Sequence, residues 1–253
     1  MAFTASAEVY DRFIGRYVRP LAPRFADFAG ITTGPVLDVG CGPGVLCAVL
    51  AERVGATNVA AVETWEPHVV ACRARVPGAD VRLGRFDRLP FADGAFAAAL
   101  SQLMLPFVND PTRVAAEMRR VVRPGGVVAA STFAAEGFAP THAFWEAARQ
   151  IDPETPDQEH PPFSHQGEIV ELWEGAGVVE IEGETIEIEA RYANFDDYWA
   201  PFVAGIGPAA EYLRAQPVPR RETIREACFE MLGNRNVGFT LRAQVLAVKG
   251  RVK

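Results

Sequence analysis

Three glycines at alternate positions, Gly40, Gly42 and Gly44, separate an apolar run from a segment of helical composition. Residues 35–39 are a short apolar run typical of a buried parallel strand, and residues 45–54 predict a helix. Glycines at such a turn allow positive φ and let a ligand approach the main chain. The free N–H groups and the positive dipole end of the helix favour a negatively charged ligand group.

The spacing of these glycines differs from the dinucleotide fingerprint. A G-x-G-x-x-G pattern would need a glycine at position 45, where the chain has Val45. Asp38, just inside the predicted strand end, would lie badly beside a pyrophosphate and well beside a cationic ligand. The sequence therefore disfavours a nicotinamide-dependent oxidoreductase.

The run Asp-Val-Gly-Cys-Gly-Pro-Gly at residues 38–44 resembles motif I of the class I S-adenosylmethionine-dependent methyltransferases, of the small-molecule, methyltransferase-type-11-like kind. The resemblance implies an α/β fold: a Rossmann-like seven-stranded sheet of order 3-2-1-4-5-7-6, with strand 7 antiparallel, helices on both faces and a helical cap. It also implies S-adenosylmethionine as cofactor. The motif positions that we expect to bind it are Asp38, Gly40, Cys41, Gly42 and Gly44.

A second apolar run at residues 58–63 ends in Glu63, at the distance from the first helix that a βαβ unit requires. A carboxylate at this strand end can accept two hydrogen bonds from ribose hydroxyls. We favour this role over that of a solvated strand-end glutamate. Thr64 and Trp65 follow as further cofactor contacts, and Trp65 either flanks the adenine or packs on the surface.

Residues 84–91 resemble the segment that carries the adenine contacts in this family, with two departures. Arg85 stands at the usual position of an acid, and Phe86 at that of a small residue. We expect the backbone N–H of Phe86 to bind adenine N1, because main-chain recognition needs no particular side chain. Arginine carries no acceptor for the adenine amino group, so Asp87 is the candidate to replace the acid.

The fourth predicted strand, residues 95–100, is followed by Ser101 and Gln102. Ligands bind at the carboxyl ends of strands in open α/β sheets, so both residues are candidate cofactor or acceptor contacts. This region lacks the Asn-Pro-Pro-Tyr type of sequence found in the branch that methylates amide and base nitrogens. Its absence disfavours an exocyclic amine of DNA as the acceptor.

The N-terminal segment, residues 1–30, places apolar and aromatic residues between Tyr10 and Tyr17 on one helical face. An amphipathic helix covering one edge of the domain explains most of them. In similar methyltransferases such a helix forms a lid over the cofactor. By that resemblance Tyr10 and Arg16 would be its contacts, with Arg16 paired to the methionine carboxylate. Two prolines at positions 20 and 23 are expected to interrupt or restart the helix.

Two aromatic segments, residues 134–165 and 194–232, interrupt the strand-helix alternation and predict a cap. Their rings could line an apolar pocket for the methyl acceptor or form the core of the cap, and both readings stay open. His142 and His165 are candidates for a general base, although ordinary packing or surface roles are favoured for each, and no catalytic residue is assigned. The rings concerned are Phe138, Phe144, Trp145, Trp199 and Phe202.

The composition limits the remaining possibilities. A chain of 253 residues suits one α/β domain over residues 1–253, and a formal net charge of −7 argues against a nucleic-acid partner. Four cysteines without a Cys-x-x-Cys pair argue against a disulfide framework or a zinc site, so no metal is expected. No apolar run has the length of a membrane span, and we expect a cytoplasmic location.

The sequence thus predicts a methyltransferase that moves a methyl group in line from S-adenosylmethionine to a small, partly apolar metabolite. The alternative is a regulatory or scaffold protein that binds the same cofactor without catalysis. Formation of S-adenosylhomocysteine with any acceptor separates the two. The sequence predicts neither the acceptor atom nor the oligomeric state.

Overall fold

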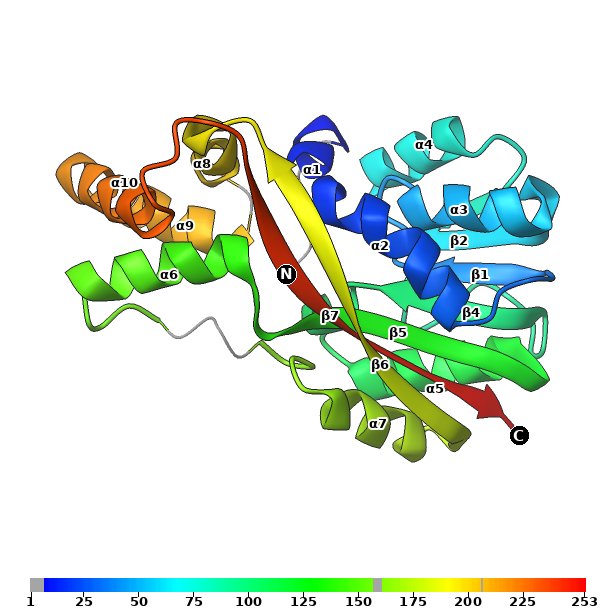
Figure 1. Cartoon of the computed structure of the whole chain (residues 1–253). Coiled ribbons are helices and arrows are strands. Elements are labelled where there is room, and N and C mark those ends of the chain that lie inside the picture. Colours follow the sequence, from blue (N-terminus) through cyan, green and yellow to red (C-terminus); the bar gives the residue numbers. More distant parts are fainter. Residues whose placement is uncertain (1–6, 157–160, 206) are drawn as a thin grey trace.

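The computed structural model describes residues 7–156, 161–205 and 207–253 (Figure 1). Seven strands form one sheet in the order β3-β2-β1-β4-β5-β7-β6, with β7 antiparallel to both of its neighbours and the first five strands parallel. The predicted strand order and the antiparallel seventh strand are confirmed. The strands are β1 (Val36–Val39), β2 (Val59–Glu63), β3 (Asp80–Leu83), β4 (Phe96–Gln102), β5 (Val122–Phe138), β6 (Val178–Tyr192) and β7 (Phe239–Val252).

Helices cover both faces of this sheet, as predicted. Buried side chains of α2 (Gly15–Phe28), α3 (Val45–Val54) and α4 (Glu66–Arg75) join one hydrophobic core, and those of α5 (Pro111–Val121) and α7 (Gln166–Gly175) join the other. Successive strand residues point to opposite faces, so Leu37 and Val39 of β1 belong to the α5 side. Asp38 therefore points toward α3. Among the described helices, none is both long enough and apolar enough to cross a bilayer.

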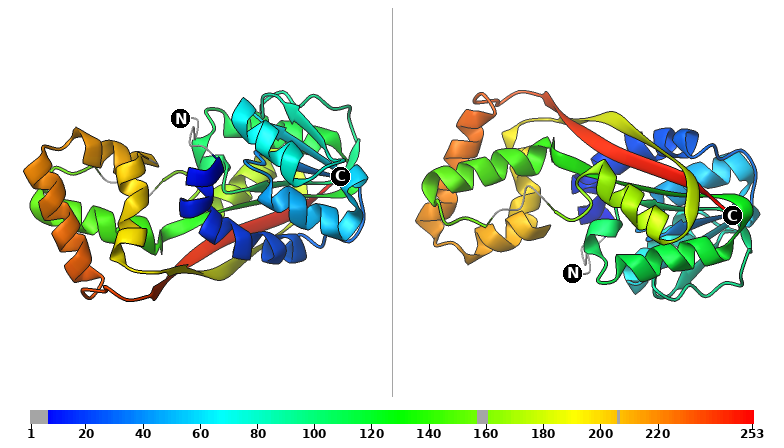
Figure 2. Two further views of the ribbon diagram at one scale, coloured as in Figure 1. Left: turned by 90° about the horizontal axis from the view of Figure 1, so that it is seen from above. Right: turned by 90° about the horizontal axis from the view of Figure 1, so that it is seen from below.

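Four further helices pack together beyond the carboxyl ends of the parallel strands and form what we call the helical cap (Figures 1 and 2). They are α6 (Ala139–Ile151), α8 (Phe195–Ala204), α9 (Gly207–Ala215) and α10 (Val218–Met231). The long strands β6 and β7 extend past the rest of the sheet to reach the cap. Helix α1 (Ala7–Phe13) lies between the cap and the sheet, and two short 3-10 helices, η1 (Ala56–Asn58) and η2 (Leu105–Phe107), complete the described elements.

The aromatic rings that could have lined an acceptor pocket pack against one another inside the cap. The rings of Phe144 and Phe202 stack with centroids 4.9 Å apart, and Phe144 meets Trp145 edge-to-face at 5.1 Å. Trp199 is also buried. These contacts favour the alternative in which the rings form the cap's own core. The side chain of Phe138 lies outside the described residues.

One local prediction differs from the structure, and one strand is irregular. The Arg-Pro-Gly-Gly sequence at residues 123–126 lies within β5, which begins at Val122. The pairing of β5 with β4 shifts register opposite Phe96 and Ala98, so these residues form an irregularity in the ladder. Pro20 and Pro23 lie inside one continuous helix, α2, and leave two carbonyls without a helical N–H partner.

Candidate functional site

The glycine loop between β1 and α3 is tied to the end of β2. The N–H groups of Gly40 and Cys41 donate to the carbonyl oxygen of Val62 at 2.9 and 3.3 Å. The next N–H, that of Gly42, donates to Glu63 Oε2 at 2.9 Å. The loop is therefore held in place by the neighbouring strand and its terminal acid.

The backbone of the loop favours glycine at all three positions, and the space around Gly40 and Gly44 excludes a Cβ. The φ angles of Gly40, Gly42 and Gly44 are +79°, +51° and +90°, a region that other residues rarely adopt. A Cβ on Gly40 would lie 2.6 Å from Met104 Cγ, and one on Gly44 would lie 2.7 Å from Cys72 Sγ. The close approach of β1, α4 and the segment after β4 thus depends on these glycines.

The Glu63 carboxylate organises the loop in addition to the ribose role predicted for it. Its Oε1 atom accepts from the N–H groups of Thr64 and Trp65 at 2.7 and 3.2 Å, and from the Thr64 hydroxyl at 3.2 Å. With the Gly42 bond, two oxygens receive four donors, and the side chain is buried. Thr64 acts here by holding Glu63. Ribose binding by Glu63 stays a prediction.

Asp38 points beneath the loop toward α3. Its Oδ2 atom accepts from Cys47 Sγ at 3.2 Å, and its Oδ1 atom is buried without a hydrogen-bond partner among the described residues. Burial raises the pKa of Asp38 to about 8. A positive charge nearby would favour the ionised form again, so the site suits the cationic neighbour predicted for it.

Two further unpartnered polar atoms lie at the carboxyl end of β4. Ser101 Oγ and Gln102 Oε1 are both buried and have no hydrogen-bond partner within the described part of the chain. The next residue, Leu103, has φ +58° and donates its N–H to Ser131 O at 2.8 Å. A left-handed backbone at a non-glycine residue is strained and marks a constrained position. Sequence analysis missed Leu103 and Met104, because neither residue type signals a turn.

A comparison of the sequence with models of known protein families shows which family this site resembles. Residues 37–130 match the family model described as "Methyltransferase domain", a range that holds the glycine loop, Glu63, Ser101 and Gln102. Over residues 37–130 the chain therefore matches a methyltransferase domain. The predicted family resemblance is confirmed, and the fold agrees with it.

Curated relatives extend the similarity beyond this domain. The chain is 29% identical over 217 residues to nocamycin O-methyltransferase from Saccharothrix syringae, covering 76% of each protein. It is 29% identical over 146 residues to malonyl-[acyl-carrier protein] O-methyltransferase from Pseudescherichia vulneris, covering 58% of this chain and 57% of that enzyme. A match of 38% identity to a 37.1 kDa protein of Streptomyces fradiae spans only 27% of that protein.

The fold is shared with a solved structure. A chain from Anaeromyxobacter dehalogenans, proposed to be a type II methyltransferase, superposes with a TM-score of 0.67 at 22% identity. The match covers 92% of this chain and 96% of that one, so it includes the cap as well as the methyltransferase domain.

Helix α1 brings Tyr10 onto the glycine loop of the methyltransferase domain. A Cβ on Gly42 would lie 3.6 Å from the Tyr10 hydroxyl oxygen, so that ring packs directly on the loop. Tyr10 also meets His68 edge-to-face at 5.4 Å, and His68 meets Trp65 at 4.5 Å. The placement of Tyr10 agrees with the predicted lid, and buried His68 links it to Trp65.

Arg16 is engaged away from the loop. Its guanidinium makes two hydrogen bonds to the Asp197 carboxylate at 3.0 and 3.1 Å, and lies 4.2 Å from the centroid of the Tyr192 ring. These partners belong to α8 and β6, so the pair fastens α2 to the cap. The predicted contact with a methionine carboxylate would require this pair to open.

We expect Asp197→Asn to lower stability at neutral pH, and the loss to become smaller as pH falls below the ordinary carboxyl pKa. The Arg16 hydrogen bonds lower the pKa of Asp197 in the folded chain, so its contribution is complete above the ordinary carboxyl pKa and is lost as pH falls through the lowered value. Urea unfolding of both chains from pH 7 to about pH 3 measures this. If the two chains differed by the same free energy of unfolding at every pH, this expectation would be contradicted.

The predicted adenine segment contains an exposed ion pair. Arg85 binds Asp87 through both carboxylate oxygens, with Nε to Oδ1 at 2.8 Å, and Arg85 is largely exposed. This pairing lowers the pKa of Asp87. It also explains how an arginine is accommodated at the usual position of an acid. The Phe86 ring lies near Gly40, where an added Cβ would be 3.7 Å from its Cζ.

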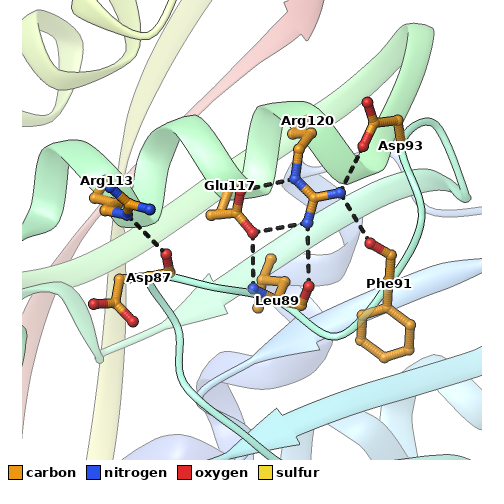
Figure 3. A network of polar contacts seen from close by, with 7 residues as sticks. All are labelled: Asp87, Leu89, Phe91, Asp93, Arg113, Glu117 and Arg120. Carbon is orange, nitrogen blue, oxygen red and sulfur yellow. Dashed lines mark hydrogen bonds and ion pairs between the residues drawn. The ribbon is translucent and has the colours of Figure 1, made fainter.

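A network on α5 positions this segment (Figure 3). The Arg120 guanidinium forms two 2.7 Å bonds with the Glu117 carboxylate and donates to the carbonyl oxygens of Leu89 and Phe91 at 3.1 and 2.9 Å. It also binds Asp93 at 2.7 Å, and Glu117 accepts from the Leu89 N–H at 2.8 Å. The spacing of Glu117 and Arg120 was visible in the sequence, but their loop partners were not.

We expect Arg120→Lys to loosen residues 85–93 and to weaken cofactor binding several-fold. A lysine ammonium cannot hold two carbonyls and two carboxylates in one plane, so bonds worth about 1 kcal/mol each are lost. Thermal unfolding and calorimetric titration with S-adenosylhomocysteine measure the two effects. Arg123→Lys, at an exposed position nearby, is the control. Equal behaviour of the two variants would mean that the network does not position the segment.

Proposed function

We propose that this protein transfers a methyl group from S-adenosylmethionine to a small, partly apolar metabolite. The observation that carries the proposal is the joint geometry of Glu63 and the glycine loop at the carboxyl edge of a methyltransferase domain. The carboxylate is fixed one strand away from a loop whose glycines admit close approach of a ligand.

The residues present fit this cofactor. Buried acceptor atoms without partners occur at Asp38, Ser101 and Gln102, at or near the carboxyl ends of β1 and β4. Such atoms are costly unless a ligand supplies donors, and an amino group and ribose hydroxyls are donors of the right kind. When bound, the cofactor supplies a methyl group on a good leaving group. The chain's task is then to align the acceptor and exclude water.

The acceptor is proposed to enter between the cap and the carboxyl edge of the sheet, beneath α1. The two named relatives are O-methyltransferases, so oxygen acceptors are the first to test. No general base is assigned. His165 caps the N-terminus of α7 in a capping box with Glu168, which favours the structural reading of that histidine, and His142 is exposed on α6.

Thermal unfolding with S-adenosylmethionine, S-adenosylhomocysteine and NADH in parallel tests the cofactor. Stabilisation by the first two alone is expected. Stabilisation by NADH alone would overturn the proposal and would indicate a nicotinamide-dependent oxidoreductase. A screen of hydroxyl and carboxyl metabolites for formation of S-adenosylhomocysteine then tests catalysis.

The second candidate is a non-catalytic protein that binds the same cofactor. The observation in its favour comes from the cap. Its buried aromatic rings pack against one another, so these contacts do not point to a binding site for an acceptor. Binding of both cofactor forms without turnover across the acceptor screen would favour it. We further propose that no nucleic acid takes part and that the protein acts in the cytoplasm.

A further inference from the structure

Three of the four cysteines meet beneath the glycine loop. Cys41 lies in the loop, Cys47 in the first turn of α3 and Cys72 in α4. Their sulfur atoms all lie within 4.8 Å of one another, and all three side chains are buried. Cys228, in contrast, lies in α10 and donates to Ala143 O within the cap.

We propose that Cys41, Cys47 and Cys72 bind one thiophilic divalent cation of the Zn²⁺ type. A tetrahedral zinc site has Zn–S bonds of about 2.3 Å, which places its sulfur atoms about 3.8 Å apart. Sulfur atoms already within 4.8 Å reach this separation through side-chain shifts of about 1 Å or less. Thiolate ligands select zinc over magnesium or calcium.

Asp38 lies beside the three thiols. Its Oδ2 atom lies 3.2 Å from Cys47 Sγ, on the same side of the sheet as the three thiols. Its Oδ1 atom is buried and unpartnered among the described residues, although such an acceptor costs free energy when left unsatisfied. A cation held by the three thiols would place a positive charge next to this buried carboxylate, whose Oδ2 atom contacts Cys47.

Two arginines of α4, Arg73 and Arg75, follow Cys72 by one and three residues. When the cation binds, the S–H bonds are broken, their protons pass to solvent, and three sulfur–metal bonds form. The two guanidinium groups offset part of the negative charge that the ligand set carries.

Binding at this cluster would join three elements of the site. Because Cys41 stands between Gly40 and Gly42, a cation would fasten the glycine loop to α3 and α4. The test of this cluster does not use the cofactor, so its failure is distinguishable from a failure of the proposed function. The competing explanation is that three cysteines pack as small apolar side chains.

The test uses the full-length chain, stripped with a chelator under reducing conditions, mixed with ZnCl₂, desalted and analysed by mass spectrometry for metal. We expect one zinc per chain, with retention lost in Cys47→Ala and Cys72→Ala and kept in Cys228→Ala, the matched control. With CoCl₂, the wild-type and Cys228→Ala chains should show the intense absorption of a tetrahedral thiolate site. No retained metal in the wild-type chain, or equal retention in all four proteins, would overturn the proposal.

A second measurement covers the case in which an alanine variant does not fold. The wild-type chain is alkylated with N-ethylmaleimide with and without ZnCl₂, and each cysteine is followed by peptide mass spectrometry. Zinc should slow the modification of Cys41, Cys47 and Cys72 at least several-fold and leave Cys228 unchanged. Equal rates at the three clustered cysteines with and without zinc would overturn the proposal.

Discussion

The Glu63→Ala variant should bind S-adenosylmethionine and S-adenosylhomocysteine about tenfold or more weakly than the wild-type chain. The substitution removes two oxygens that hold Gly42, Thr64 and Trp65, and it removes the acceptor predicted for the ribose hydroxyls. The disordered loop and the lost hydrogen bonds to the cofactor should both lower the affinity. Isothermal titration calorimetry measures the affinity.

Glu66→Ala is the matched control for this experiment. Glu66 lies three residues later in the first turn of α4, is exposed, and pairs only loosely with Arg73 at 4.0 Å. We expect its removal to leave cofactor affinity unchanged. If Glu63→Ala bound the cofactor as tightly as Glu66→Ala does, the proposed role of this carboxylate would be rejected.

The Gly44→Ala variant should lose both stability and cofactor binding. Two costs combine at this position. The φ of +90° strains any residue with a Cβ by about 1 to 2 kcal/mol, and the new methyl group would lie 2.7 Å from Cys72 Sγ and 3.0 Å from its Cα. Because the Cα cannot move without shifting α4, we expect about 1 to 3 kcal/mol more from overpacking.

Gly125→Ala separates the two costs. Gly125 has a similar φ of +75°, but nothing lies within 4 Å of an added Cβ, and the residue is exposed in the irregular part of β5. It should therefore show the backbone strain alone. Urea unfolding of both variants measures the difference. Equal losses of stability would show that the contact with Cys72 relaxes without cost.

Much of the methyltransferase domain could be predicted from the sequence because its signals are local. Short apolar runs that end in Val39 and Glu63, with a glycine turn and a helix between them, specify a βαβ unit whatever the rest of the chain does. The same patterning locates Ser101 and Gln102 at a strand end. Loop positions such as Gly40 and Gly44 were identified by spacing, and the structure supplies the steric reason for them.

The remaining features depended on which distant segments the fold brings together. No spacing rule places Cys72 beside Cys41 and Cys47, and the lack of a Cys-x-x-Cys pair argued against the metal site that we now propose. Arg16 was assigned to the methionine carboxylate by the family resemblance, and no local pattern pointed to its partner Asp197, which lies 181 residues away. A long arginine can bind any acceptor within reach, so only the tertiary structure decides which one it meets.

The sequence by itself thus determined the sheet, its strand order through the family resemblance, and the positions of the glycine loop and its acid. The strand order came from the resemblance, whereas the strands, the glycine loop and its acid follow from periodicity and from backbone requirements that act within a few residues. The tertiary structure decided that the cap's rings fill its own core, that Tyr10 covers Gly42, and that three thiols lie under the loop. Such contacts arise from the packing of whole elements, and a linear pattern of residues does not encode that packing in any short segment.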